Sequence, residues 1–145
     1  MNKQKGFTII ELIVVIAIIA VLAAIVMVNV TKYIAQGKDA SIKGNMSSMT
    51  TIAAAVYDAA SSYDGLASDS AFSGGLTAIA GANNGAGKDL FVKTGGAAFC
   101  VVAKLNEKTG SPAVNKVWCV DSTGFKGEIA DYASCDATNA TCAAD

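Results

Sequence analysis

The stretch KGFTIIELIVVIAIIAVLAAIV, Lys5 to Val26, combines the length of a membrane span with a single acidic residue. From Phe7 to Val30 the only ionisable side chain is Glu11. A helix needs about 20 apolar residues to cross a bilayer, and this run supplies them. Insertion of a charged side chain at the bilayer centre costs about 2.5–3.5 kcal/mol. Glu11 lies nearer the edge of the bilayer, so its cost should be smaller, but its carboxylate still needs a partner. We therefore expect residues 7–30 to span a membrane and Glu11 to have a function.

Two simpler interpretations of the apolar run fit less well. A cleaved secretory signal has a hydrophobic region of about 7–15 residues, shorter than this one and without a carboxylate. A plain membrane anchor gives no reason for Glu11. Lys3 and Lys5 precede the run, which predicts that the N-terminus stays on the cytoplasmic side of the membrane.

The helix is predicted to continue beyond the apolar run as an amphipathic half over residues 31–64. Apolar residues there recur mostly at three- and four-residue steps. They are Ile34, Ile42, Met46, Met49, Ile52, Ala53, Val56 and Ala60. We expect one helix from Phe7 to Tyr63, with Gly65 as its C-terminal cap and Gly37 and Gly44 as bend sites.

The remaining residues, 65–145, predict a connecting region, a β-meander and a cysteine-bearing end, so that 31–145 would form one globular head. Residues 64–88 are rich in Gly, Ser, Ala and Asn and are interpreted as a loop with a short helical turn around GGLTAIAGA, residues 74–82. Three runs then read as strands: DLFVKT, AFCVVAKL (Ala98–Leu105) and VNKVWCVD (Val114–Asp121). In the second run, Phe99, Val101, Ala103 and Leu105 would share the apolar face that covers the helix, and Cys100 and Val102 would lie on the outer face. An antiparallel meander with this apolar face against the helix gives an α+β fold.

The four cysteines predict disulfides formed outside the cytoplasm. They are Cys100, Cys119, Cys135 and Cys142. An even number in one small domain favours a disulfide framework, and no close C-x-x-C pair indicates zinc. If Leu105 faces Val114 across the hairpin, Cys100 faces Cys119 at a distance that suits a disulfide. Of the three possible pairings we therefore favour 100–119 with 135–142.

The composition argues against several classes of function. The chain of 145 residues has a net charge of -1 with no His and no Arg. The common neutral-pH general base is missing, no basic patch indicates nucleic acid, and no catalytic constellation occurs. We expect no enzyme, no cofactor and no metal site. The segment Asp121–Glu128 has carboxylates only near its ends, so it is interpreted as a solvated turn and not as a Ca²⁺ loop.

At Lys5–Val26 the sequence closely resembles the N-terminal signature of type IV pilins and pseudopilins. The shared features are a short basic leader (residues 1–6), Gly6 before Phe7, a Thr-Ile-Ile-Glu stretch and an unbroken apolar run. The resemblance implies a pilin-like α+β fold with a long N-terminal helix on a small antiparallel sheet. It also implies that prepilin peptidase cuts between Gly6 and Phe7 and methylates the Phe7 amine, and that Glu11 serves in assembly.

The same resemblance implies partners and a location. The partners would be copies of the chain in a helical filament, prepilin peptidase, an assembly ATPase and an inner-membrane platform protein. The subunit would be a single-pass inner-membrane protein with a cytoplasmic N-terminus, and later part of an extracellular or periplasmic filament. The implied function is adhesion, motility or DNA uptake. The alternative is a pseudopilin of a type II secretion system, and a remoter one is an exported binding module on a membrane anchor.

The sequence departs from this family at two positions. Many relatives carry a helix-breaking Gly where Ala20 stands and a Pro where Val28 stands. Without them the apolar half is expected to stay continuously helical.

Overall fold

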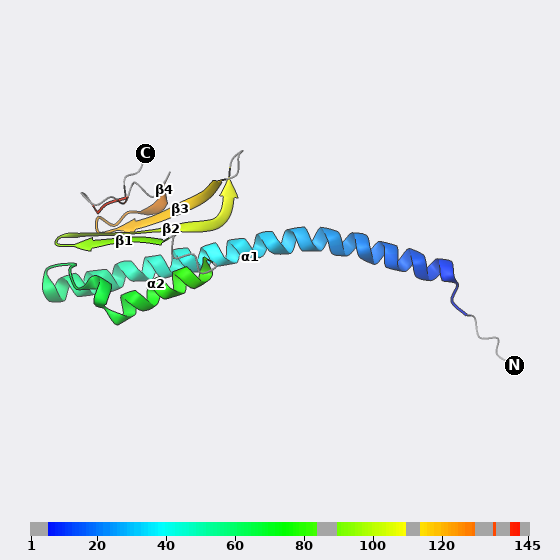
Figure 1. Ribbon diagram of the computed structural model, residues 1–145, viewed down its shortest axis with the longest axis horizontal. Coiled ribbons are helices and arrows are strands. Elements are labelled where there is room, and N and C mark those ends of the chain that lie inside the picture. Colours follow the sequence, from blue (N-terminus) through cyan, green and yellow to red (C-terminus); the bar gives the residue numbers. More distant parts are fainter. Residues whose placement is uncertain (1–5, 84–89, 110–113, 130–134, 136–139, 143–145) are drawn as a thin grey trace. The chain divides into compact units, whose positions relative to one another are not determined.

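The computed structural model describes residues 6–83, 90–109, 114–129, 135 and 140–142. Lys3 and Lys5 of the leader, and residues 110–113 between the second and third predicted strands, lie outside the described residues. The fold is the expected α+β one, pilin-like, with a long N-terminal helix followed by an antiparallel sheet (Figure 1). It divides into two compact units, one ending at Ile34 and the other beginning at Ala35. The long helix contributes residues to both.

Helix α1 runs from Ile9 to Ala60, and the positions of Gly37, Gly44, Ala20 and Val28 are all helical. Its predicted end at Tyr63 is three residues too late. Ser61 adopts a left-handed conformation with φ 54°, and its N–H donates to the Tyr57 carbonyl at 2.6 Å, which closes the last turn. Gly65, the predicted C-cap, instead precedes the short 3₁₀ helix η1, Leu66–Ser68.

The short helical turn predicted around residues 74–82 is part of a longer helix, α2, which occupies Ser70–Ala82, so the loop prediction is wrong at residues 70–73. The Asp69 carboxylate caps this helix by accepting a hydrogen bond from Phe72 N at 2.9 Å. Phe72 and Ile79 lie on one face of α2 and are fully buried. Helix α2 contains three glycines, and each lowers the helix propensity of the segment. The helix forms because burial of its apolar face outweighs this low propensity.

The sheet has four antiparallel strands in the order β1-β2-β3-β4, a meander as predicted but with one more strand. The strands are β1 (Leu90–Gly95), β2 (Ala98–Thr109), β3 (Val114–Asp121) and β4 (Lys126–Ile129). The segment Asp121–Glu128 was interpreted as a solvated turn. The turn occupies only the residues between Asp121, which ends β3, and Lys126, which begins β4. Gly124 supplies the positive φ of 92° that this turn requires.

The core lies between one face of the sheet and the two helices of the second unit. It contains apolar side chains from α1, α2, β2 and β3, among them Met46, Met49, Phe72, Phe99 and Val101. The opposite face carries a second cluster that includes the four cysteines, Val102, Val117 and Ile129. The predicted division of β2 is therefore confirmed, with Phe99, Val101, Ala103 and Leu105 toward the helices.

The predicted register of the β2–β3 hairpin is wrong by four residues next to the loop and by two residues at the cysteines. Cys100 pairs with Asp121, and Cys119 pairs with Val102. Val114 pairs with Thr109 and not with Leu105, because β2 extends to Thr109 and a bulge lies between Lys104 and Lys108. Because both errors are even numbers of residues, the paired side chains keep their predicted faces but change their partners.

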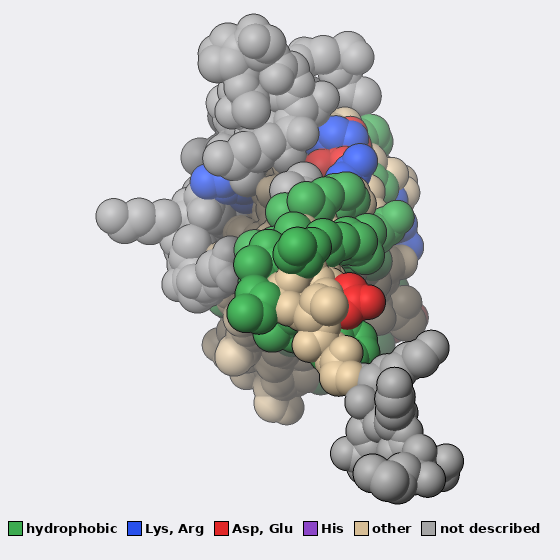
Figure 2. All heavy atoms as spheres, turned by 90° about the vertical axis from the view of Figure 1, so that its right-hand side faces the viewer, with side chains coloured by type: hydrophobic (Ala, Val, Ile, Leu, Met, Phe, Trp, Pro, Cys, Tyr) green, Lys and Arg blue, Asp and Glu red, His purple; other side chains and the backbone are tan. Residues whose placement is uncertain are grey.

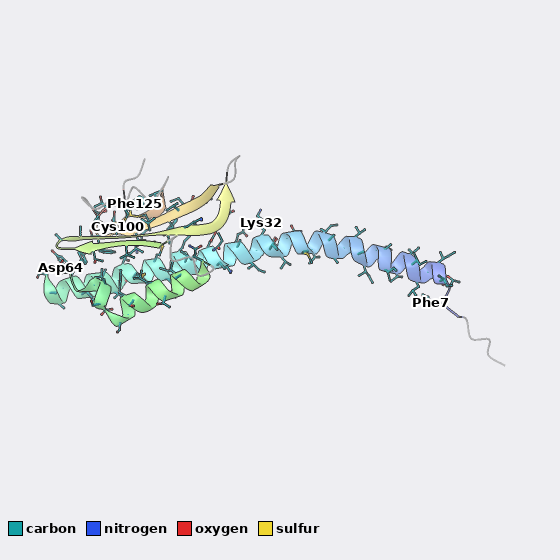
Figure 3. The ribbon with its side chains drawn as sticks, viewed as in Figure 1. Phe7, Lys32, Asp64, Cys100 and Phe125 are labelled. Carbon is teal, nitrogen blue, oxygen red and sulfur yellow. A yellow bond between two sulfur atoms is a disulfide. The ribbon has the colours of Figure 1, made fainter. Side chains whose placement is uncertain are left out.

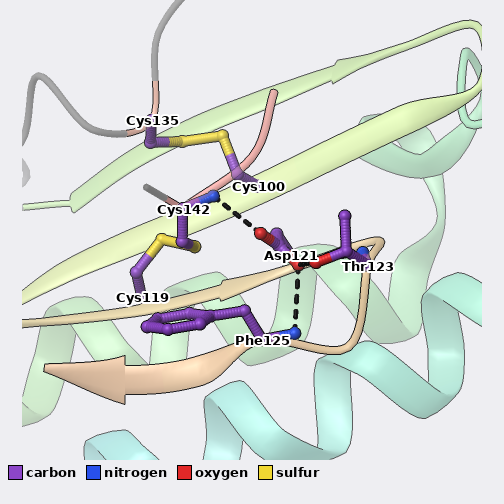
Figure 4. The surroundings of a disulfide bond; sticks show 7 residues. All are labelled: Cys100, Cys119, Asp121, Thr123, Phe125, Cys135 and Cys142. Carbon is purple, nitrogen blue, oxygen red and sulfur yellow. Dashed lines mark hydrogen bonds between the residues drawn. A yellow bond between two sulfur atoms is a disulfide. The ribbon is translucent and has the colours of Figure 1, made fainter. Parts of the chain in front are cut away.

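The favoured disulfide pairing is wrong for the same reason. The disulfides join Cys100 to Cys135 and Cys119 to Cys142, each with Cα atoms 6.0 Å apart (Figure 4). In the observed register Cys100 and Cys119 are diagonal neighbours, which usually lie about 7–8 Å apart and beyond ordinary disulfide reach. Cys135 and Cys142 do lie opposite each other in an antiparallel bridge, but each sulfur bonds to the sheet.

Candidate assembly site

The start of α1 is held by a reciprocal pair of side chains, Thr8 and Glu11. The Thr8 hydroxyl accepts from Glu11 N at 3.2 Å, and the Glu11 carboxylate accepts from Thr8 N at 2.8 Å. The Thr8 hydroxyl also donates to the same Glu11 oxygen at 2.7 Å. This is the capping box of a Thr-x-x-Glu sequence, which satisfies N–H groups that the first helical turn leaves unpaired.

Sequence reasoning gave Glu11 a role but missed Thr8. The signal was present, since T-I-I-E places an acid three residues after a hydroxyl just before an apolar run. In the uncleaved chain Glu11 thus has local partners, and these partners also anchor its carboxylate at the first turn of α1.

Gly6 and Phe7, the predicted processing residues, lie immediately before the helix. Neither is in regular secondary structure, both are exposed, and the Phe7 side chain is 83% exposed. The Gly6–Phe7 peptide bond is therefore open to approach. A Cβ placed at Gly6 would have no neighbour within 4 Å, so packing within this chain does not require Gly there.

The apolar part of α1 is exposed on all sides. Figure 3 shows its side chains projecting outward between Phe7 and Lys32, and Figure 2, viewed from the N-terminal end, shows hydrophobic side chains at this end of the helix. Every residue from 6 to 27 is exposed, and even Val15 keeps 46% exposure. Such a surface in water is strongly unfavourable, so it must be covered by lipid or protein.

Two shallow apolar grooves run along this helix. One is lined by Val14, Ala17, Ile18, Val21 and Leu22. The other extends from Ile19 to Thr31. The amide of Asn29, a polar residue near the end of the run, donates a hydrogen bond to the Ile25 carbonyl at 3.2 Å, which satisfies one of its two N–H groups. Helix α1 is long and apolar enough to cross a membrane by length and composition.

Comparison with known proteins identifies the N-terminal segment. Residues 1–27 match the family model of the prokaryotic N-terminal methylation motif, the signature of type IV pilins and pseudopilins. No curated protein and no solved structure matches the chain. The matched segment contains Gly6, Phe7, Thr8 and Glu11, together with most of the apolar run.

The motif and the exposed apolar helix both support a pilin-like or pseudopilin subunit. The motif supports a pilin-like or pseudopilin substrate of prepilin peptidase and a filament-forming structural subunit, and it points away from an enzyme. The exposed apolar helix fits membrane anchoring before assembly.

Proposed function

We propose that this chain is the structural subunit of a type IV pilus-like filament that serves adhesion, motility or DNA uptake. Prepilin peptidase removes residues 1–6 and methylates the Phe7 amine, and the apolar helices of many copies then form the filament core. The observation that carries the proposal is that the apolar residues 7–27, which lie within the methylation motif, are all exposed. Copies of the same helix cover this surface once the subunit leaves the lipid, and burial of apolar area drives assembly.

Glu11 has a specific task in this scheme. Cleavage creates a positive amine at Phe7, and in a dry filament core the carboxylate of one copy neutralises the amine of the next. A buried charge that loses its partner costs about 3–5 kcal/mol, so the correct axial stagger between neighbours is favoured and wrong staggers are penalised. The Thr8 bonds support this role, because they hold the carboxylate at the end of the helix where the amine forms.

The mature N-terminus tests the processing step. Mass spectrometry of the subunit, purified from cells that contain prepilin peptidase, should show a chain that begins at a methylated Phe7. A chain that begins beyond Val21, or that keeps residues 1–6, would support the exported binding module on an anchor or signal instead.

The exchange Glu11→Gln tests the assembly step. It should leave cleavage and the amount of subunit in the membrane unchanged and lower the yield of sheared fibres at least tenfold. The control is Glu128→Gln, which removes an exposed carboxylate from β4 that is 3.5 Å from Lys43 Nζ and Lys116 Nζ. Normal fibres from Glu11→Gln would overturn the stagger role.

The alternative is a pseudopilin of a type II secretion system, which uses the same motif and helix. Electron microscopy of cells that express the chain at its natural level separates the two. Long surface fibres that bind antibody against the head support the pilus, and a short periplasmic fibre with loss of secretion on deletion of the chain supports the pseudopilin.

A further inference from the structure

The outer face of the sheet carries a buried carboxylate among the four cysteines. Asp121 ends β3 and is 2% exposed. One of its oxygens, Oδ2, accepts a hydrogen bond from the backbone N–H of Cys142 at 2.6 Å (Figure 4). Cys119, the disulfide partner of Cys142, lies two residues earlier on the same strand and so on the same face. Residue 142 is thus attached to β3 twice, through its backbone at Asp121 and through its sulfur at Cys119.

The other oxygen of Asp121 is fixed by the turn that follows β3. Oδ1 accepts from Thr123 N at 2.9 Å, from the Thr123 hydroxyl at 2.6 Å and from Phe125 N at 3.1 Å. These bonds span only two to four residues, so they form with the β3–β4 hairpin itself. The local turn therefore orients the carboxylate with Oδ2 directed at the C-terminal segment (Figure 4), and a charged acceptor makes this bond strong.

The native disulfide pairing is not the one that loop-closure entropy alone would favour. The native disulfides join residues 35 and 23 positions apart, whereas Cys135 and Cys142 are seven apart. For a flexible chain, loop-closure entropy makes the contact of Cys142 with Cys135 roughly sixfold more frequent than its contact with Cys119. In the fold these two cysteines even lie opposite each other in a bridge. Something other than proximity along the chain must select 119–142.

We propose that Asp121 is the positioning residue that selects the disulfide pairing. Its carboxylate docks the backbone of Cys142 beside Cys119 before either disulfide has formed. The bridge between Cys142 and Cys135 then places Cys135 near Cys100, which lies opposite Asp121 across β2 and β3. One hydrogen-bond acceptor thereby directs both disulfides.

The oxidation itself needs an external disulfide. The thiolate of Cys119 or Cys142 attacks that disulfide, releases one thiolate and forms a mixed disulfide. The second cysteine's thiolate then attacks the protein sulfur of the mixed disulfide and releases the other thiolate. Two protein thiols lose two protons and two electrons, and the external disulfide is reduced to two thiols. Asp121 takes no part in the electron transfer and acts only on the distance between the sulfurs.

Refolding of the full chain in detergent micelles, with oxidised and reduced glutathione, tests the proposal. Free thiols are trapped at early times and the disulfides are mapped by mass spectrometry. Asp121→Asn keeps the size of the side chain but replaces one acceptor oxygen by an amide NH₂ group. It should raise the ratio of 135–142 to 119–142 at least fivefold over the unmodified chain.

The matched control is Asp39→Asn, which alters a carboxylate that is 5% exposed and accepts three hydrogen bonds on the other side of the sheet. It should leave the ratio of pairings unchanged. An unchanged ratio in Asp121→Asn, or an equal rise in Asp39→Asn, would overturn the proposal, because then pairing would not depend on Asp121 or would follow general stability.

A second measurement needs no change at Asp121. The proposal requires the Cys142 N–H to be bound while all four thiols are still reduced. In the fully reduced chain, hydrogen exchange at the Cys142 amide should be at least tenfold slower than in denaturant. Exchange as fast as in denaturant would mean that docking follows the disulfides, and the proposal would fail even if the Asp121 variant did not fold.

Discussion

Asp39 on α1 binds Asn106 on β2 through both the backbone and the side chain of that residue. The Asp39 Oδ1 atom accepts from Asn106 N at 2.6 Å and from Asn106 Nδ2 at 3.0 Å. The other carboxylate oxygen accepts from Glu107 N at 2.9 Å. Both residues lie where the β2–β3 register shifts, so the carboxylate supplies partners for amides at the bulge.

Replacement of Asp39 by Ala should lower the free energy of unfolding by about 2–4 kcal/mol, because it strips the acceptor from two backbone amides in a partly buried site. Denaturant titration of the full chain in micelles, monitored by the fluorescence of Trp118, measures this free energy of unfolding. Asp58→Ala, at an exposed position of the same helix, should change the value by less than about 0.5 kcal/mol. Equal effects of the two changes would contradict a specific role for Asp39.

Two adjacent glycines of α2 should respond in opposite ways to Ala. A Cβ at Gly75 would lie 2.9 Å from Met49 Cγ and 3.1 Å from its sulfur, whereas a Cβ at Gly74 meets nothing within 4 Å. Gly75→Ala should destabilise the head by about 1–3 kcal/mol, because Met49 is fully buried and must shift. Gly74→Ala should stabilise it by up to about 1 kcal/mol through helix propensity. Thermal unfolding of the two variants checks the sign, and stabilisation by both would refute the close packing.

Asp64 should make stability depend on acid. Its carboxylate accepts from Gly96 N at 2.8 Å and from the Ser62 hydroxyl at 2.8 Å. The Gly96 amide first, and the Ser62 hydroxyl second, lower the pKa of Asp64 below its usual value of 3.8. Because the pKa is lower in the folded state, this stabilisation is complete above the unfolded pKa and is lost as the pH falls through the folded one.

Asp64→Asn measures this contribution. The unmodified chain should be more stable than the variant at pH 7, and the difference should shrink below about pH 4, as protonation removes the charge. Denaturant titrations at several pH values give both free energies. A difference that stays constant down to pH 2 would show that the charge of Asp64 is not the cause.

Thr8→Val should loosen the first turn of α1, because it removes the hydroxyl that caps the helix and bonds Glu11. Loss of a Thr cap costs about 1 kcal/mol, which raises the equilibrium constant for local opening of the first turn roughly fivefold. Amide exchange at Glu11 in micelles should rise by that factor, while Thr8→Ser, which keeps a hydroxyl, should restore it. Unchanged exchange in Thr8→Val would mean that the capping box does not hold the turn in the membrane-mimetic setting.

The local features of this chain followed from its sequence. The predictions were correct for the long helix, for three of the strands and for the two faces of β2. Each of these features depends on neighbours within a few residues. Helix α2 was predicted only as a short turn because its glycines weaken local propensity, while its stability comes from burying Phe72 and Ile79 against distant segments. Strand β4 was missed because Lys126–Ile129 is short and gains its partners only from β3.

The apolar character of the N-terminal run, the methylation motif and the outward face of Cys100 could be predicted from the chain alone, since hydropathy and side-chain alternation are local properties. Contacts between distant segments set which cysteines meet. The β2–β3 pairing places Cys100 and Cys119 diagonally across the two strands, and a hydrogen bond between Asp121 and Cys142 joins segments 21 residues apart. Such contacts depend on the free energy of the whole fold, which no local pattern encodes.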